Sequence, residues 1–127
     1  MKISTKTTYG LQAMVYLSRY DKKPVALKEI SQKERIPFAY LEKIFSILEK
    51  NNLVKSKKGP NGGYMLAKKN ITLSDIVAPL EGDIMKCISK GCTMQCKCQT
   101  YGVGIKIQEA IYKTLKSIKL FDLSQKS

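Results

Sequence analysis

The sequence of 127 residues contains no histidine, few carboxylates and no long hydrophobic run. The lack of histidine leaves the four cysteines as the obvious ligands for a transition metal. A small thiol oxidoreductase would need a substrate pocket and an acid–base group beside its cysteines, and the sequence offers neither. We therefore expect no enzyme, and no small-molecule substrate is evident.

The first apolar stretch, residues 11–17, is interrupted by Gln12 and followed by Arg19. It is too short and too amphipathic for a signal peptide or a membrane span. We therefore expect a cytoplasmic protein that does not enter membranes, in a compartment where thiols stay reduced.

The shortage of carboxylates leaves a formal net charge of +13 at pH 7. Residues 1–69 contain 15 basic and 5 acidic side chains, whereas residues 70–127 contain 8 and 5. A basic N-terminal half favours a polyanionic partner, because neutralising phosphates releases their counterions. The same charge would be found if the lysines served only solubility. It would also be found in a protein that binds RNA or the ribosome. A salt-dependent gel shift with duplex DNA against RNA separates these classes.

Residues 27–50 have the pattern of two helices joined by a tight turn. The first helix is expected over Leu27–Glu34 and ends before Pro37, since the residue before a proline is pushed out of the helical region. The second is expected from Phe38 to about Asn51. Its apolar residues recur at spacings of three and four: Phe38, Leu41, Ile44, Phe45 and Leu48.

A glycine-rich turn, residues 59–63, follows the second helix between two short segments suited to strands. Two helices with a tight connection and a following hairpin form a winged helix-turn-helix. We therefore predict a mainly α fold with a small β-hairpin wing. The charge and this pattern together favour double-stranded DNA as the partner.

Two further helices are expected beside this unit. One runs from Thr7 to about Tyr20, with Thr7 or Thr8 as its N-cap. Another, shorter helix begins after residue 71, where Thr72 and Asp75 resemble a capping box with aspartate in the glutamate position.

A long helix is expected from Tyr101 to about Leu120. It carries a wide apolar stripe: Val103, Ile107, Ala110, Ile111, Thr114, Leu115 and Ile118. Such a stripe either pairs with its twin in a homodimer or folds back over its own domain, and we expect the homodimer. The chain is thus divided into a DNA-binding domain (1–82), a cysteine-containing loop (83–100) and a dimerisation helix with tail (101–127).

The second helix and the hairpin supply the candidate DNA contacts. If the apolar side of the helix faces the core, its outward face offers Phe38, Ala39, Tyr40, Glu42 and Lys43. Glu42 is suited to a cytosine amino group, and Lys43 to a guanine or a phosphate. Lys55, Lys57 and Lys58 of the hairpin are suited to phosphates. A plain surface charge at Glu42 and an ordinary exposed hairpin are the alternatives.

All four cysteines lie within twelve residues, at Cys87, Cys92, Cys96 and Cys98. In a chain whose thiols stay reduced, such a cluster indicates metal or redox chemistry rather than structural disulfides. Thiolates suit both iron–sulfur clusters and zinc. The two CxxC pairs usual in a zinc site are absent, so the spacing favours an iron–sulfur cluster. Zinc, a metal-free thiol switch and unligated thiols are the alternatives.

Several motifs resemble those of the Rrf2 family of bacterial transcriptional regulators. They are Met1–Lys6, Tyr9–Leu11, Leu27–Ser31, Tyr40–Glu42, Gly59–Ala67 and Ile71–Ile76. The resemblance spans nearly the whole chain, and a GPxGGYxLA wing after a recognition helix is specific. It implies a dimeric winged-helix repressor or activator that pairs through its long C-terminal helix. We therefore expect binding to a roughly palindromic operator.

The resemblance also bears on the cysteines. In the cluster-binding members, three cysteines before the dimer helix bind a 2Fe-2S or 4Fe-4S cluster. By position, Cys87, Cys92 and Cys98 match these ligands, and Cys96 is an extra thiol suited to be the fourth. Some members use a histidine as the fourth ligand, which this chain lacks. Others use an aspartate from the partner's first helix, where this chain has Thr8.

The DNA contacts that the resemblance implies are Tyr40 and Glu42 in the recognition helix, and Lys58, Asn61 and Gly62 in the wing. Ala39 stands where some relatives have a polar residue that contacts a base. The operator preference is therefore expected to differ from theirs.

Overall fold

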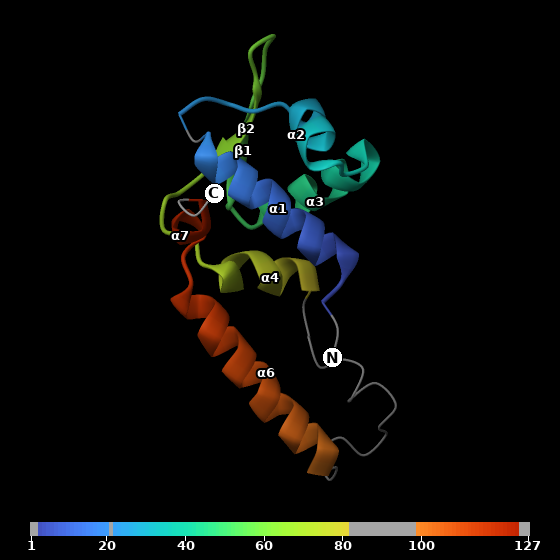
Figure 1. Cartoon of the computed structure of the whole chain (residues 1–127), viewed down its shortest axis with the longest axis vertical. Coiled ribbons are helices and arrows are strands. Elements are labelled where there is room, and N and C mark those ends of the chain that lie inside the picture. Colours follow the sequence, from blue (N-terminus) through green and yellow to red (C-terminus); the bar gives the residue numbers. More distant parts are fainter. Residues whose placement is uncertain (1–2, 21, 82–98, 125–127) are drawn as a thin grey trace.

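The computed structural model describes residues 3–20, 22–81 and 99–124 (Figure 1). Six helices and one antiparallel hairpin occur in this part of the chain, so the predicted mainly α fold with a small wing is confirmed. In order, the elements are α1 (Thr5–Arg19), α2 (Leu27–Glu34), α3 (Phe38–Lys50), β1 (Val54–Lys57), β2 (Gly63–Leu66), α4 (Leu73–Glu81), α6 (Gln99–Ser117) and α7 (Leu120–Ser124).

The core lies around α1, which runs through the middle of the molecule and contacts α3, α4 and α7 (Figure 1). Of the regularly spaced apolar residues of α3, Leu41, Ile44, Phe45 and Leu48 are fully buried, whereas Phe38 is exposed on the outward face. The buried residues pack in one cluster with residues from α1, α2 and α4, and the large members of that cluster include Met14, Leu17, Ile30, Leu41, Ile44, Phe45, Leu48 and Ile76. Because one face of α3 is used completely by the core, its other face is left for solvent or a partner.

The wing is anchored to the chain ahead of α2. β1 pairs with β2 from Val54 opposite Leu66 toward the turn. On the other side of β2, Val25 and Tyr64 exchange two backbone hydrogen bonds of 2.8 Å each. Gly63 has a φ of 152°, and a Cβ there would lie 2.4 Å from the Val25 carbonyl oxygen. This close crossing requires glycine.

The start of α1 differs from the prediction. Ser4, rather than Thr7 or Thr8, is the N-cap, and its hydroxyl accepts a hydrogen bond from the Thr7 N–H at 3.3 Å. Ser4 is held in place because its own N–H and hydroxyl both donate to the Glu81 carboxylate at 2.9 Å. This contact joins residues 77 positions apart, so local sequence signals did not reveal it.

The capping box at the start of α4 is confirmed. The Thr72 N–H donates to Asp75 Oδ2 at 3.0 Å, and the Asp75 N–H donates to Thr72 Oγ1 at 3.3 Å. Two otherwise unpaired donors of the first turn are thereby satisfied.

The long helix ends at Ser117, so the predicted end near Leu120 is wrong. The chain turns there because it pairs with the segment ahead of α4. The Leu73 N–H donates to the Ile118 carbonyl at 3.0 Å, and the Leu120 N–H donates to the Ile71 carbonyl at 2.9 Å. This pairing brings Leu120 into the core, where it is fully buried. None of the helices in the described ranges is long and apolar enough to cross a membrane.

Candidate nucleic-acid interface

The turn between α2 and α3 sets the angle at which α3 is presented. Arg35 adopts a left-handed conformation with a φ of 56°, which ends α2. The Ile36 N–H donates to the Ser31 carbonyl at 3.1 Å, and the Ser31 hydroxyl donates to the Ile36 carbonyl at 2.6 Å. Ile36 itself is buried. These bonds fix the two helices as a unit, as a helix-turn-helix requires.

The side chains that the sequence predicted on the outward face of α3 are exposed in the structure. They are Phe38, Ala39, Tyr40, Glu42 and Lys43, all in the first half of α3. The ring of Tyr40 meets the ring of Tyr9 edge-on, with centroids 5.3 Å apart. Tyr9 lies on α1, so α1 contacts an exposed residue of this face.

Glu42 lies on the side of α3 that faces the wing. The pKa of the Tyr64 phenol on β2 is raised, first by burial and then by the nearby Glu49 and Glu42 carboxylates. Glu49 is engaged, since it accepts a hydrogen bond from the Ser56 hydroxyl at 3.0 Å. Glu42 precedes Glu49 by about two helical turns, so both lie on the same side of α3, and Glu42 is exposed and suited to accept hydrogen bonds from a base.

The wing presents lysines and a bare backbone. Lys55, Lys57 and Lys58 are exposed, and so is Asn61 in the turn. The Gly62 N–H donates to the carbonyl of residue 59 at 3.0 Å, which closes the turn. A Cβ at Gly62 would lie 2.0 Å from the Lys57 carbonyl oxygen, so glycine is required there as well.

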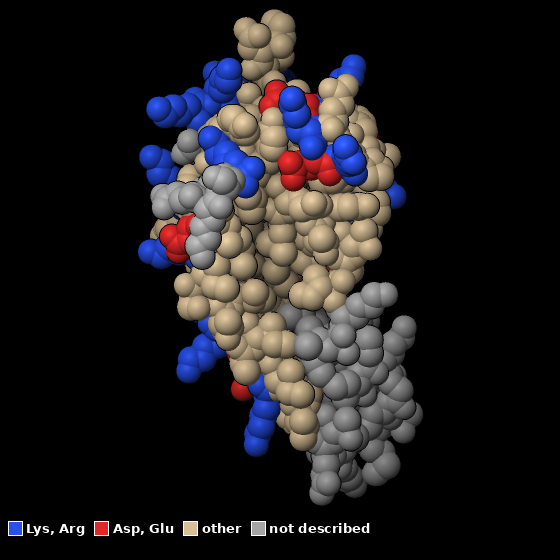
Figure 2. Space-filling model, viewed as in Figure 1, with Lys and Arg blue, Asp and Glu red and all other residues tan. Residues whose placement is uncertain are grey.

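Basic side chains gather at the wing end of the molecule. In Figure 2 the blue side chains are most frequent on the upper part of the viewed face, where a few red ones lie among them, whereas the protruding tip and the middle of the face are tan. The hairpin stands clear of the helices (Figure 1). Its lysines are therefore accessible to a polyanion as large as a duplex.

Sequence reasoning missed two side chains that border this surface. Lys6 and Tyr9 come from α1, and both approach the start of α3. The one signal for this approach was a glycine inside a predicted helix. Gly10 lies so close to α4 that an added Cβ would be 2.4 Å from Leu80 Cδ1 and 3.5 Å from Ile44 Cγ2.

The four candidate metal ligands, Cys87, Cys92, Cys96 and Cys98, lie outside the described residues. Within the described residues, no group of three or more histidine, cysteine, aspartate or glutamate side chains is placed to hold a metal ion. The last described residue before the cysteines is Glu81, at the end of α4.

The apolar stripe of α6 is divided between two environments. Toward its C-terminal end, Ile111 and Leu115 pack against Val77, so this half folds back over its own domain. Toward the N-terminal end, Val103 and Ile107 are 55% and 39% exposed. The exposed half extends away from the rest of the described molecule (Figure 1).

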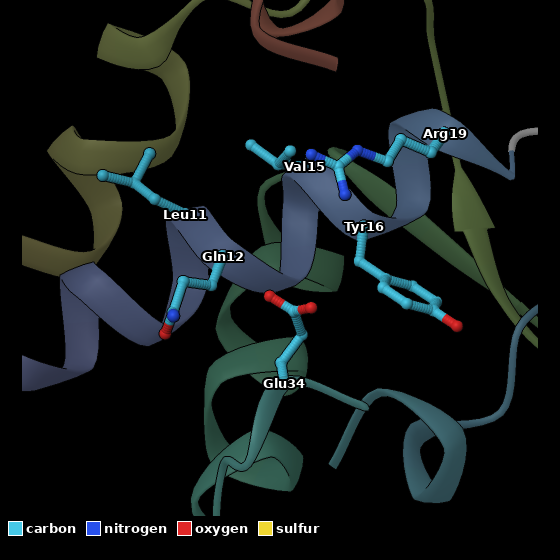
Figure 3. A pocket seen from close by; sticks show the side chains of 6 residues that line it. All are labelled: Leu11, Gln12, Val15, Tyr16, Arg19 and Glu34. Atoms are coloured by element: carbon cyan, nitrogen blue, oxygen red, sulfur yellow. The ribbon is translucent and has the colours of Figure 1, made fainter. Parts of the chain in front are cut away.

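A shallow hollow on α1 adjoins this stripe. It has a volume of about 250 Å³ and is lined by Leu11, Gln12, Val15, Tyr16, Arg19 and Glu34. Figure 3 shows the side chains that α1 contributes, with the carboxylate of Glu34 pointing toward α1 from the end of α2. Leu11 packs against Val77, as Ile111 and Leu115 of α6 do, so the hollow lies next to the half of α6 that folds back over the domain.

Comparisons with known proteins agree with this geometry. Residues 3–126 match the Rrf2 family model, described as an iron-dependent transcriptional regulator. The HTH-type transcriptional regulator IscR of Xenorhabdus nematophila is 33% identical over 129 residues, covering 97% of this chain and 79% of that protein. The structure of CymR (YrzC), the global cysteine regulator of B. subtilis, is 35% identical with a TM-score of 0.81, covering 100% and 98%. The structure of T. potens IscR is 35% identical with a TM-score of 0.79, covering 98% and 87%.

Proposed function

Because the chain belongs to the Rrf2 family of DNA-binding transcriptional regulators, we propose that it binds a roughly palindromic operator as a homodimer. It is a regulator and not an enzyme. The observation that carries the proposal is the exposed first half of α3, which lies beside a lysine-bearing wing and has its other face fully used by the core.

In this proposal α3 enters the major groove. Tyr40, Glu42 and Lys43 meet base edges, with Glu42 accepting from a cytosine amino group. Lys55, Lys57 and Lys58 neutralise phosphates, and Asn61 and Gly62 let the wing backbone approach the sugar–phosphate chain. Phosphate contacts set position and base contacts set sequence, so the wing supplies affinity and α3 supplies specificity.

Dimerisation is proposed through α6. Val103, Ile105 and Ile107 are exposed apolar side chains close together on α6, and neighbouring exposed apolar side chains often mark an interaction surface. A two-fold dimer would place two copies of α3 on successive major-groove faces. A roughly palindromic operator follows from that symmetry.

We further propose that an iron–sulfur cluster on Cys87, Cys92, Cys96 and Cys98 modulates DNA binding. Four thiols suit the cluster chemically, because thiolates are its usual ligands. When bound, the cluster would make the regulator sensitive to iron or oxidants. The iron-dependent description of the family and the IscR relatives support this proposal. The CymR structure, described as that of a global cysteine regulator, is 35% identical, as is the T. potens IscR structure, so a metal-free thiol switch is the alternative. Zinc is the third possibility.

The wing is tested with the double variant Lys57→Ala/Lys58→Ala in salt-dependent binding to duplex DNA. Affinity for all sequences should fall, and the slope of log K against log salt should flatten by about 0.9 for each ammonium group removed. Lys113→Ala/Lys116→Ala removes the same charge from the exposed side of α6 and is the matched control. An unchanged affinity and slope in the wing variant would remove the wing from the proposal.

The cluster is tested by anaerobic purification, an absorption spectrum, and iron, sulfide and zinc analysis. We expect visible charge-transfer bands with stoichiometric iron and sulfide, lost in Cys92→Ala. A colourless protein that contains zinc would support the zinc reading. A metal-free protein that forms a disulfide would support the thiol switch. Either outcome leaves the DNA-binding proposal in place.

A further inference from the structure

We propose that the first turn of α1 is a further DNA-binding element, in which Lys6 holds a backbone phosphate beside the recognition helix. The inference rests on the proposed docking of α3 in the major groove. It adds a contact on the side of α3 opposite the wing, outside the helix-turn-helix and outside the hairpin.

The observation that carries the inference is a hollow between α1 and α3. It has a volume of about 360 Å³ and is lined by Lys6, Pro37, Ala39, Tyr40 and Lys43. Its charged lining consists of two lysines from two different helices, and no carboxylate lines it. Phosphate oxygens are the partners that lysine ammonium groups most often meet on DNA. The Lys6 ammonium also lies near the Glu81 carboxyl and helps to lower its pKa, but Glu81 does not line the hollow. The charge of the lining is therefore positive and complementary to the DNA backbone.

The hollow is continuous with the proposed base-reading face. Tyr40 and Lys43 belong to both, so a duplex that contacts these side chains also passes the hollow. A helix with its side chains is roughly 10–12 Å across and the major groove is about 12 Å wide, so phosphates of the two strands flank a docked helix on either side. In the view of Figure 1 the hairpin lies above α2 and α3, and the start of α1 lies below them. The wing and Lys6 are thus placed to meet opposite walls of one groove.

The position of Lys6 is fixed by the end of α4. The Glu81 carboxylate accepts hydrogen bonds from the Ser4 N–H at 2.9 Å, the Ser4 hydroxyl at 2.9 Å and the Thr7 hydroxyl at 2.6 Å. Lys6 lies between the two residues that make these bonds. The first turn of α1 is thereby held against the domain instead of fraying, as helix ends often do. A phosphate-binding side chain on this turn is preorganised, which lowers the entropy cost of the contact.

The test compares Lys6→Ala with wild type in binding to a duplex that wild type has selected from a random library. The dimer loses two ammonium groups, so the slope of log K against log salt should flatten by about 1.8. The rank order of operator variants should stay the same, because a phosphate contact carries no base information. Lys6→Arg should restore the slope, and Lys113→Ala, which removes a lysine from α6, should leave it unchanged.

The outcomes separate this inference from the function on which it rests. Lys6→Gln keeps most of the side-chain length and guards against a folding defect, which circular dichroism would detect. If Lys6→Ala and Lys6→Gln both keep the wild-type slope while Lys57→Ala/Lys58→Ala flattens it, the α1 contact is wrong and the wing contact stands. If wild type selects no duplex, the proposed operator binding itself is wrong.

Discussion

Tyr40 and Glu42 are close in sequence, yet the fold gives them different surroundings. The ring of Tyr40 packs edge-on against the ring of Tyr9. Glu42 and Glu49 both lie on the wing side of α3, but Glu49 is bonded to Ser56 and Glu42 has an exposed carboxylate. Base recognition is therefore proposed for Glu42, whereas the hydrogen bond to Ser56 gives Glu49 a structural role.

This assignment predicts different effects for two substitutions that remove the same charge. Glu42→Ala should relax the preference at one base pair of each half-site, at a cost of roughly 1–3 kcal/mol in discrimination. Glu49→Ala should leave the base preference unchanged. Competition binding with a panel of single-base operator variants measures both. Equal preferences in wild type and Glu42→Ala would contradict base reading by this residue.

Glu81 predicts a pH dependence of stability. Burial alone would raise the pKa of its carboxyl, but hydrogen bonds from Thr7 and Ser4 and the nearby Lys6 ammonium lower it below its usual range. A carboxyl with a lowered folded-state pKa stabilises the fold above its unfolded pKa of about 4.3, and this contribution is lost as the pH falls through the folded value.

Urea unfolding at a series of acid pH values checks this expectation. Wild type should lose more free energy of unfolding than Glu81→Gln as the pH falls through the range below about 5. Glu109→Gln, at an exposed position of α6, should follow wild type. Parallel curves for wild type and Glu81→Gln would show that the Glu81 network contributes nothing to acid sensitivity.

At the scale of elements, the wing depends on one backbone crossing. Gly63 sits where Val25 pairs with β2, and any side chain there would collide with the Val25 carbonyl. Gly63→Ala should therefore destabilise the fold by roughly 1–3 kcal/mol, the usual cost of a residue forced into such a conformation. The thermal unfolding temperature and the salt slope of DNA binding should both change, because the displaced wing carries the lysines proposed to contact phosphates.

The matched control is Gly102→Ala. Gly102 lies in α6, and an added Cβ would meet nothing within 4 Å. The same chemical change should stabilise this helix by roughly 0.5–1 kcal/mol, since alanine is the better helix former. If both variants were equally stable, the steric account of the wing anchor would be wrong.

The sequence predicted correctly those elements that depend on a few neighbouring residues. The turn at Ile36–Pro37, the glycine-rich hairpin and the capping box of Thr72 and Asp75 each depend on a few neighbouring residues, and all three occur in the structure. The start of α1 and the end of α6 were misplaced. Both are set by hydrogen bonds between residues far apart in the sequence. Ser4, at the start of α1, donates to Glu81, and Leu120, just after α6, donates to the Ile71 carbonyl.

The candidate site shows the same division. Residues of α3 and the wing could be predicted, because helical periodicity and a hairpin turn determine which side chains are exposed. The bordering residues Lys6 and Tyr9 could not. They lie next to α3 because α1 packs closely on the domain at Gly10, beside Leu80 and Ile44, which is a property of the tertiary fold.

At the scale of the whole molecule, the exposed half of α6 predicts the oligomeric state. Ile107→Glu should yield a soluble monomer, because the substitution places an unpaired charge on the proposed interface without touching the domain's own core. Ile111→Glu is a less clean probe, since Ile111 already packs on Val77 and its loss would also affect folding. Light scattering measures the mass of each variant.

Lys106→Gln is the control, because it lowers the charge by one unit, as Ile107→Glu does, at the neighbouring residue of α6. This variant should remain a dimer. A monodisperse wild-type monomer would contradict the dimer proposal. It would also remove the reason to expect an operator with two-fold symmetry. A dimer in which Ile107→Glu remains fully paired would place the interface on another surface.

The most direct test of sequence-specific reading by α3 is selection of duplexes from a random library by wild type. The affinity of the enriched duplex is then compared with that of a shuffled one at equal salt. We expect an inverted repeat with half-sites about one helical turn, or a multiple of it, apart, bound at least roughly 10³-fold more tightly than the shuffled duplex. Enrichment of no repeat, with equal affinity for both duplexes at every salt concentration, would contradict the account.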